Sequence, residues 1–548
     1  MSNNPYDSRP WLALYDRNQP AEIAPDYHDA LAIFQAAAAR APNRPAILYF
    51  DGGLTYRALD QASDSLAAAL QQRGFAPGDR LGLYLQNVPG FVLGMLAAWK
   101  TGGIAVPITP MNRERELSKL FNDCSPRVLI CHHELSGIVA QVPNRPETVL
   151  VTSPLDYQSR NDPRLFAAGQ TPRAAGAKEL RDAIAANIGR SPSAAPIAPS
   201  DVAFLVYTSG TTGVPKGAMC THANVAFNAQ TYRDWIGLGE GAPILGIAPL
   251  FHVTGLIGHI SAAFITAAPL ILTYRFEAGV MLDAAAEHRP AFTIGAITAF
   301  IALMNHPDSR REQLASLRQV YSGGAAIPPS VVDAFRDKFG LVIRNAYGLT
   351  ETNSPTHLAP REREAPVDPS SGSLSVGLPV YNVRAWISDD DGRPTPVGEA
   401  GEIVVDGPMV VPGYWNKPQE TAEVMREGGF HTGDIGFMDQ EGWFYLIDRK
   451  KDMINASGYK VWPREIEDLV YMHPAVREAA VVGVGDPYRG ETVKLVISLK
   501  PGVELTEGEM IAFCKPRLAA YKCPRIVQIM DELPKTPSGK ILRRELRG

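Results

Sequence analysis

Short apolar runs alternate with longer, helix-like stretches along the first two thirds of the chain. Apolar runs at 80–85, 104–109 and 127–132 predict strands, and the stretches at 90–100 and 113–123 predict helices. Parallel strands joined by crossover helices give this alternation. The pattern therefore predicts an α/β fold, with a large N-terminal domain of mainly parallel sheets covered by helices.

The pattern changes twice further along the chain. Residues 360–373 are polar and rich in Pro and Ser, and the short strands and turns that follow predict a small β-subdomain. A charged stretch at 447–454 then separates apolar runs, and the remaining residues can form a compact α+β unit. We therefore expect an N-terminal domain at 1–447 and a smaller C-terminal domain at 453–548.

Composition narrows the class of protein. Of the 548 residues, 45% are hydrophobic and 20% are charged, which is typical of a soluble globular protein. A net charge of −5 argues against nucleic acid as a partner, because there is no basic excess to neutralise phosphates. The five cysteines are scattered without a CxxC pair, so we expect free thiols and a cytoplasmic location.

Membrane insertion is not expected from the sequence. The N-terminal residues are polar and lack the apolar region of a signal peptide. No Asp, Glu, Lys or Arg occurs between Glu240 and Arg275, but Pro, Gly and His interrupt this segment, which predicts buried core. Peripheral membrane contact, and the choice between monomer and homodimer, stay open.

The segment 207–217 is rich in Gly, Ser and Thr, carries one Lys and has no acidic residue. We expect a strand at 203–206 before it and a helix at 221–236 after it, and glycines let several N–H groups approach one anion. Lys216 is not in the Walker A position, and Gly217 replaces the hydroxyl residue that would hold magnesium there. A flexible linker would share this composition but would not explain the lysine between a strand and a helix. The segment therefore predicts a phosphate-binding loop of another kind.

At this point the motifs resemble a known family. The segment 205–216 is similar to the signature of the adenylate-forming superfamily, which includes acyl-CoA synthetases, peptide-synthetase adenylation domains and firefly luciferase. Further motifs of that family follow in its order at 249–255, 321–326, 347–352, 429–436, 448–454, 457–467 and 534–546. The motifs resemble above all the fatty-acid–CoA ligase branch.

The resemblance implies two reactions that use ATP, Mg²⁺ and coenzyme A. A carboxylate attacks the α-phosphate of ATP, and the thiol of coenzyme A then takes the acyl group and releases AMP. Lys540 is expected to bridge the α-phosphate and the carboxylate, and Lys216 to hold the leaving pyrophosphate as the secondary lysine. The expected ATP-binding residues are Thr208, Ser209, Gly210, Thr211, Thr212, Gly213, Lys216, Gly324, Ala325, Asn345, Ala346, Tyr347, Gly348, Thr350, Asp434, Arg449 and Lys540.

Within this set the resemblance implies separate roles. Tyr347 is expected to face adenine, and Asp434 and Arg449 to bind the ribose. Thr208 and Glu351 are expected to bind Mg²⁺, which prefers oxygen ligands.

The resemblance also implies an acyl pocket, a coenzyme A tunnel and a hinge. The expected acyl-pocket residues are His252, Val253, Gly255, Gly295, Ala296, Ile297, Gly323, Gly324 and Gly348. His252 is a candidate catalytic residue that gates the pocket, although an uncharged core histidine fits its position equally. Gly458 and Tyr459 are expected to line the tunnel. Residues 448–452 with Lys451 are expected to form a hinge for a mobile C-terminal domain.

The sequence limits the class of carboxylic acid that the pocket can bind, but it does not identify the acid. Acetate-activating relatives carry Trp at the position of Gly348, and the expected pocket has no Arg or Asp suited to a dicarboxylic or amino acid. We therefore expect an apolar medium- to long-chain acid. The alternatives are an aryl or short branched acid, or a carrier-protein thiol loaded in trans, since the chain ends eight residues after Lys540. A nucleotide-binding scaffold without activity is disfavoured, because Lys540, Glu351 and the loop are all present.

Overall fold

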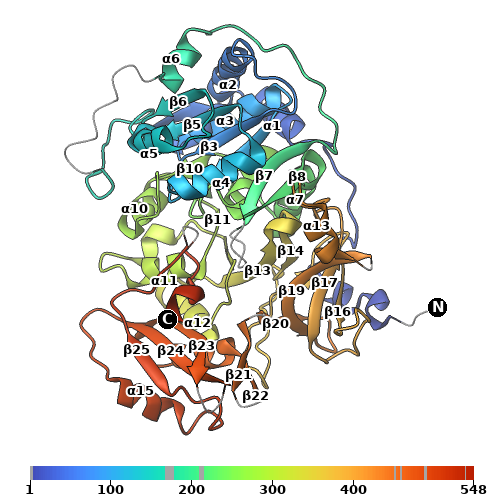
Figure 1. The fold of residues 1–548 in the computed structure, drawn as a ribbon, viewed down its shortest axis with the longest axis vertical. Helices are drawn as coiled ribbons and strands as arrows, with labels where there is room; N and C mark the ends of the chain where they lie inside the picture. Colours follow the sequence, from blue (N-terminus) through green and yellow to red (C-terminus); the bar gives the residue numbers. More distant parts are fainter. Residues whose placement is uncertain are drawn as a thin grey trace.

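The computed structural model describes most of the chain, in eight ranges: 4–166, 178–208, 215–426, 428–449, 452–456, 459–486, 490–536 and 539–547 (Figure 1). Several expected site residues lie outside these ranges: the loop residues Ser209–Gly213, the hinge residue Lys451 and the tunnel residue Gly458. The side chain of Arg449 is also not described.

A six-stranded sheet forms the part of the N-terminal domain that carries the phosphate loop. Its strand order is β6 (Thr148–Thr152), β5 (Val128–His132), β3 (Arg80–Tyr84), β4 (Ile104–Ile108), β7 (Val202–Thr208) and β8 (Lys216–Thr221), parallel except for β8. The helices that follow its strands or lie nearby are α2 (Tyr56–Gln71), α3 (Pro89–Lys100), α4 (Glu114–Cys124), α5 (Ser136–Gln141) and α6 (Leu180–Ala185). Every residue of α3 is buried, so this helix forms core rather than surface.

A nine-stranded sheet forms the second large layer. Its order is β15 (Leu378–Pro379), β14 (Ser354–Leu358), β13 (Ile343–Leu349), β12 (Gln319–Gly323), β11 (Phe292–Gly295), β9 (Ile244–Leu245), β10 (Leu270–Leu272), β1 (Pro45–Tyr49) and β2 (Gly52–Thr55). The strands from β13 to β1 are parallel, and the outer strands are antiparallel. Its helices include α1 (Ala30–Arg40), α7 (His222–Ile236), α10 (Ala278–His288), α11 (Ile297–Asn305) and α12 (Pro329–Phe339). The predicted α/β fold is confirmed.

Two smaller sheets complete the fold (Figure 1). The β-subdomain contains β16 (Arg384–Ser388), β17 (Gly401–Asp406), β18 (Met425–Arg426), β19 (Gly429–Met438) and β20 (Phe444–Arg449), with α13 (Pro418–Val424) nearby. The C-terminal sheet contains β21 (Ile454–Ala456), β22 (Tyr459–Val461), β23 (Val476–Asp486), β24 (Gly490–Leu499) and β25 (Ile526–Ile529), with α14 (Pro463–Tyr471) and α15 (Glu507–Cys514). The chain therefore changes sheets between β20 and β21, where the charged stretch lies. The domain bounds at 447 and 453 stay a prediction.

One element near the phosphate loop differs from the prediction. The loop does not pass directly from a strand into a helix, because β8 pairs antiparallel with β7 and only then does α7 begin. The missed strand has the sequence Lys-Gly-Ala-Met-Cys-Thr, which is apolar in its centre and buried at four of its six positions. The strands on the two sides of the loop therefore pair with each other before the helix begins.

The uncharged segment between Glu240 and Arg275 is buried core, as predicted. It forms β9, α8 (Val253–Gly255), the π-helix η4 (Leu256–Ser261), α9 (Ala262–Ile265) and β10. No described helix is long and apolar enough to cross a membrane. The five cysteines carry no disulfide, and Cys124, Cys131, Cys220 and Cys514 are buried.

Candidate active site

The base of the phosphate loop is held by the β7–β8 hairpin. Thr208 ends β7 and lies opposite Lys216, the first residue of β8, and the Thr208 hydroxyl donates to the Lys216 carbonyl oxygen (3.4 Å). Both residues are half-buried. The Lys216 ammonium nitrogen lies 5.2 Å from the ring centroid of Tyr414, at cation–π distance. The two predicted residues Thr208 and Lys216 therefore lie opposite each other, at the end of the strand pair that adjoins the loop.

Tyr414 was not predicted to belong to the site. Its hydroxyl donates to Oε1 of Glu351 at 2.6 Å, and its neighbours Gly413 and Trp415 form backbone hydrogen bonds of 3.0 and 2.8 Å with β8. Burial first, and then the negative charge of Glu351, raise the pKa of Tyr414, so it stays a neutral donor. Tyr414 therefore links the predicted phosphate lysine, Lys216, to the predicted metal ligand, Glu351. In the sequence, Tyr414 and Trp415 are an aromatic pair after Pro-Gly, and neither side chain carries a charge that would have indicated a phosphate or metal site.

Glu351 is suitably placed for a magnesium ion. It lies in η6 (Thr350–Thr352), which packs on β8 through a contact between the Cys220 sulfur and the Thr350 carbonyl oxygen (4.0 Å). Its backbone oxygen accepts from the N–H of Val411 (2.9 Å). Among the described residues no three His, Cys, Asp or Glu form a metal cluster. Mg²⁺ usually binds through one or two carboxylates, with phosphates and water as its other ligands, and Glu351 offers one carboxylate.

The predicted nucleoside residues also come together. The Tyr347 hydroxyl donates to Oδ2 of Asp434 at 2.9 Å, and Asp434 is only 3% exposed. In β19, Asp434 is the cross-strand partner of Arg449 in β20. The Asn345 amide donates to the Ser375 carbonyl oxygen (3.1 Å), which ties β13 to the chain that leads into β15. Tyr347, Asp434 and the backbone of Arg449 therefore lie at one place, although they come from three strands.

The turn after β12 lies at the carboxyl ends of the parallel strands, where ligands of α/β sheets usually bind. A Cβ on Gly323 would come within 2.7 Å of the Ala346 carbonyl oxygen, so the backbones of these two residues nearly touch. Gly324 has a φ of +79°, and no atom of the described residues lies within 4 Å of the place where its Cβ would be. As far as the described residues show, a Cβ on Gly324 would therefore point into open space, unlike one on the other predicted pocket glycines.

The other predicted pocket glycines border packed atoms. A Cβ on Gly348 would lie 2.1 Å from the Ser354 carbonyl oxygen, and one on Gly255 would lie 2.1 Å from that of Pro249. A Cβ on Gly295 would lie 2.7 Å from the side chain of Ile247. Gly348 therefore makes room for the neighbouring strand β14, and its role in leaving the acyl pocket open stays a prediction.

His252 begins the predicted acyl-pocket segment. Its Nδ1 accepts from the N–H of Thr254 (3.3 Å) and so caps the first turn of α8. Burial, and then the nearby positive charge of Lys540, lower the pKa of His252 to about 4. His252 is therefore neutral at physiological pH. Lys540, from the C-terminal domain, is the nearby charge that contributes to this lowered pKa.

The turn that carries Lys540 is docked on the N-terminal domain. The Thr298 hydroxyl, in the first turn of α11, donates to the Gly539 carbonyl oxygen at 2.9 Å. Within the turn, the Lys540 N–H donates to the Thr536 hydroxyl (3.0 Å), and the Thr536 N–H donates to the Lys540 carbonyl oxygen (2.6 Å). A Cβ on Gly539 would lie 3.3 Å from that of Ala296, a predicted acyl-pocket residue. Lys540, His252 and Ala296 are therefore gathered at one site, although they come from both domains.

Comparison with known proteins identifies the family of the chain. The family described as AMP-binding enzyme matches residues 34–415, and its C-terminal domain matches residues 465–540. The chain belongs to the AMP-binding enzyme family. Within this family it is similar to the long-chain-fatty-acid–CoA ligase of Bacillus subtilis, with 36% identity over 98% of this chain and 97% of the relative. The feruloyl-CoA synthase of an Amycolatopsis species is 34% identical over 92% of this chain and 96% of its own.

Solved structures of AMP-binding enzymes give the same result for the fold. The anthranilate CoA ligase AuaEII in complex with anthranoyl-AMP superposes with a TM-score of 0.85 and 27% identity, over 97% of this chain and 98% of its own. A benzoate CoA ligase from Burkholderia xenovorans gives a TM-score of 0.84 and 25% identity, over 95% of this chain and all of its own.

The predicted tunnel residue does not join the site in this conformation of the AMP-binding enzyme. Tyr459 is 58% exposed, and its ring stacks on that of Tyr521 within the C-terminal domain, with centroids 4.6 Å apart. Figure 1 shows β22, which carries Tyr459, far from β7 and β8. The described conformation therefore presents Lys540, and not Tyr459, to the N-terminal domain.

Proposed function

We propose that this protein is an ATP-dependent carboxylic acid–CoA ligase that forms AMP. It converts a carboxylic acid and ATP into an acyl-adenylate and pyrophosphate, and then transfers the acyl group to the thiol of coenzyme A. The observation that carries the proposal is the docking of the turn 539–540 on the N-terminal domain. The Gly539 carbonyl oxygen accepts a hydrogen bond from Thr298, and the charge of Lys540 contributes to the lowered pKa of His252. Similarity to named CoA ligases over nearly the whole chain supports the same conclusion.

In the first reaction two anions must meet, because a carboxylate attacks a triphosphate. Lys540 supplies positive charge between the attacking carboxylate and the α-phosphate, where the transition state gathers negative charge. Lys216 supplies charge at the pyrophosphate, held at the hairpin base. Glu351 and Thr208 would hold a magnesium ion, which neutralises phosphate charge when bound. The neutral His252 leaves the carboxylate without a competing cation beside Lys540.

In the second reaction the C-terminal domain turns at residues 448–452. This motion withdraws Lys540 and brings Gly458 and Tyr459 to the acyl-adenylate, where they line the approach of the thiol. AMP is a good leaving group, so the thiol needs no strong base from the protein.

The proposed substrate is an apolar medium- to long-chain fatty acid. The segments after His252, α8, η4 and α9, are mainly apolar and buried, which supports an apolar acyl pocket. Fatty-acid ligases of Bacillus subtilis and Escherichia coli are similar over 98% of the chain. An aryl acid is the second candidate, because feruloyl-CoA synthase is nearly as similar and the solved neighbours act on anthranilate and benzoate. The free cysteines support a reducing compartment such as the cytoplasm.

The proposal is tested in two steps. A panel of fatty, aryl and short branched acids is assayed with ATP and coenzyme A, with a carrier protein as the alternative thiol. Lys540→Ala should lower acid-dependent pyrophosphate exchange by at least ~100-fold, the usual effect of removing a transition-state donor, while ATP binding is kept. Lys216→Ala should lower exchange less. Unchanged exchange in Lys540→Ala, or a larger loss in Lys216→Ala, would contradict the assigned roles.

A further inference from the structure

Outside the ATP and acyl sites, a dense cluster of charged residues lies where the two domains meet. It joins four carboxylates to three guanidinium groups: Asp448, Asp452, Glu467, Asp468, Arg464, Arg543 and Arg547. Arg543 lies three residues after Lys540, at the start of η8 (Arg543–Leu546). The cluster therefore connects the tail that carries Lys540 to the last residues of β20.

Arg543 binds carboxylates on both sides of Lys451, the expected hinge residue. Its Nη2 donates to both oxygens of Glu467, at 3.0 and 2.8 Å, within the C-terminal domain. Its Nη1 donates to Oδ1 of Asp448 at 3.2 Å, on the N-terminal side of the hinge, and lies 3.5 Å from Asp452. Burial alone would lower the pKa of Arg543, but Glu467 and Asp448 raise it, so it stays charged.

Asp448 is held from the C-terminal domain through both of its oxygens. Arg543 binds Oδ1, and the backbone N–H of Arg464 donates to Oδ2 at 3.1 Å. Arg464, only 3% exposed, also donates to the Leu446 carbonyl oxygen at 2.6 Å. These bonds join α14 and η8 of the C-terminal domain to β20 of the β-subdomain. A rotation about the hinge cannot keep their geometry.

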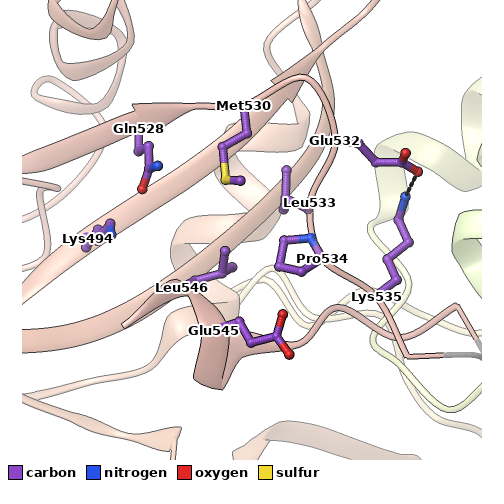
Figure 2. A pocket seen from close by; sticks show the side chains of 9 residues that line it. All are labelled: Lys494, Gln528, Met530, Glu532, Leu533, Pro534, Lys535, Glu545 and Leu546. Carbon is purple, nitrogen blue, oxygen red and sulfur yellow. Dashed lines mark hydrogen bonds and ion pairs between the residues drawn. The ribbon is translucent and has the colours of Figure 1, made fainter. Parts of the chain in front are cut away.

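The tail between Lys540 and Arg543 is firmly attached to its own domain. The Leu542 N–H donates to the Pro534 carbonyl oxygen (2.8 Å), and Lys535 pairs with Ile541, the residue after Lys540. Leu533 and Leu546 line a pocket of about 530 Å³, and Figure 2 shows both side chains with the ion pair between Lys535 and Glu532. Both leucines belong to an apolar cluster on the C-terminal sheet. Arg543 and Lys540 therefore lie on one segment that is packed against the C-terminal sheet, so they move together with that domain.

Asp448 lies on the strand that leads to the predicted ribose-binding residues. It is next to Arg449 in β20, and Arg449 is the register partner of Asp434 in β19. One strand therefore carries the ribose residue and the carboxylate that Arg543 binds. The bond between Arg543 and Asp448 fixes the distance between the nucleoside and the segment that carries Lys540.

We propose that Arg543 is a positioning residue for the adenylation reaction. By binding Asp448 across the hinge, it holds the C-terminal domain in the orientation that places Lys540 at the α-phosphate. This bond must break before the thiol reaction, while the bonds of Arg543 to Glu467 and Asp452 turn with the domain. The inference rests on the proposed function, because it assumes that Lys540 acts in the first reaction and not in the second.

The test separates the two reactions in the full-length protein. Asp448→Asn removes the charge across the hinge and keeps the size of the side chain. We expect acid-dependent pyrophosphate exchange to fall about 10-fold, while thioester formation from synthetic acyl-adenylate and coenzyme A changes less than about 2-fold. Arg547→Gln is the matched control, since Arg547 pairs with Asp452 (3.0 Å) in the same tail and should leave both reactions within about 2-fold.

A second variant keeps the inference testable if Asp448→Asn is unstable. Arg543→Gln should also slow exchange more than thioester formation, and the double variant should lose less than the product of the single losses, because both single variants break the same bond. Equal losses in both reactions, or no loss in exchange, would overturn the positioning role. The proposed function fails separately, if Lys540→Ala retains exchange or if no acid supports exchange in the unaltered protein.

Discussion

Replacement of Gly539 by alanine tests whether the docked turn is needed for adenylation. Gly539 has a φ of +85°, a conformation that costs an L-residue about 1 kcal/mol. The added Cβ would lie 2.7 Å from the Thr298 hydroxyl oxygen, so the bond between Thr298 and the Gly539 carbonyl is also lost. A hydrogen bond contributes about 1 kcal/mol net, so the docked turn is destabilised by about 2 kcal/mol in total. At 1.36 kcal/mol for each factor of ten, this predicts an approximately 30-fold loss.

The assay again uses the two half-reactions. Acid-dependent pyrophosphate exchange should fall about 30-fold in Gly539→Ala, whereas thioester formation from synthetic acyl-adenylate should stay within about 2-fold, because that step does not use the docked turn. Thr298→Ala removes the hydrogen bond alone and should lower exchange about 5-fold. The double variant should resemble Gly539→Ala, since the bond can be lost only once.

Two results would refute this reasoning. If the double variant lost about 150-fold, the product of the single losses, the two residues would not share a contact. If Gly539→Ala slowed both half-reactions equally, the turn would stabilise the C-terminal domain as a whole rather than its docking.

Two further predictions follow from the same structure. Tyr414→Phe keeps the ring beside Lys216 but removes the donor to Glu351, so the Mg²⁺ concentration needed for half-maximal exchange should rise about 10-fold; an unchanged Mg²⁺ requirement would remove Tyr414 from the site. His252 titrates at about 4 in the folded state and near 6.5 when unfolded, so the unfolded state binds more protons between these values and stability should fall as pH falls through them, by about 3 kcal/mol for this group. The midpoint of thermal unfolding should depend less on pH between 4 and 6.5 in His252→Gln than in the unaltered protein. The same pH dependence in both proteins would contradict the lowered pKa of His252.

The sequence was sufficient for the elements with strong local patterns. The helices α3 and α4 and the strands β3, β4 and β5 have nearly the predicted positions, because each is a run of local sequence with a clear apolar pattern. Strand β8 was missed because it is short and immediately follows a Gly-rich loop, whose composition suggested that the turn continued to the helix.

Contacts between distant residues could not be read from the sequence. Tyr414 is 63 residues from Glu351, and Arg543 is 95 residues from Asp448, so no local pattern brings them together. Gly348 shows the same limit in another form. A glycine signals that a side chain is excluded, but only the fold shows that the Ser354 carbonyl oxygen lies where the Cβ would be.

The contact between Lys216 and Tyr414 gives the ammonium group a partner within the protein when no phosphate is bound. When pyrophosphate has left, the ammonium group still faces an aromatic ring that attracts it, worth about 0.5–1 kcal/mol at an exposed site. Under the proposed function, Lys216 is therefore already held beside the hairpin when ATP binds, and its ammonium group leaves the ring for the pyrophosphate. The ring then serves as its partner between turnovers.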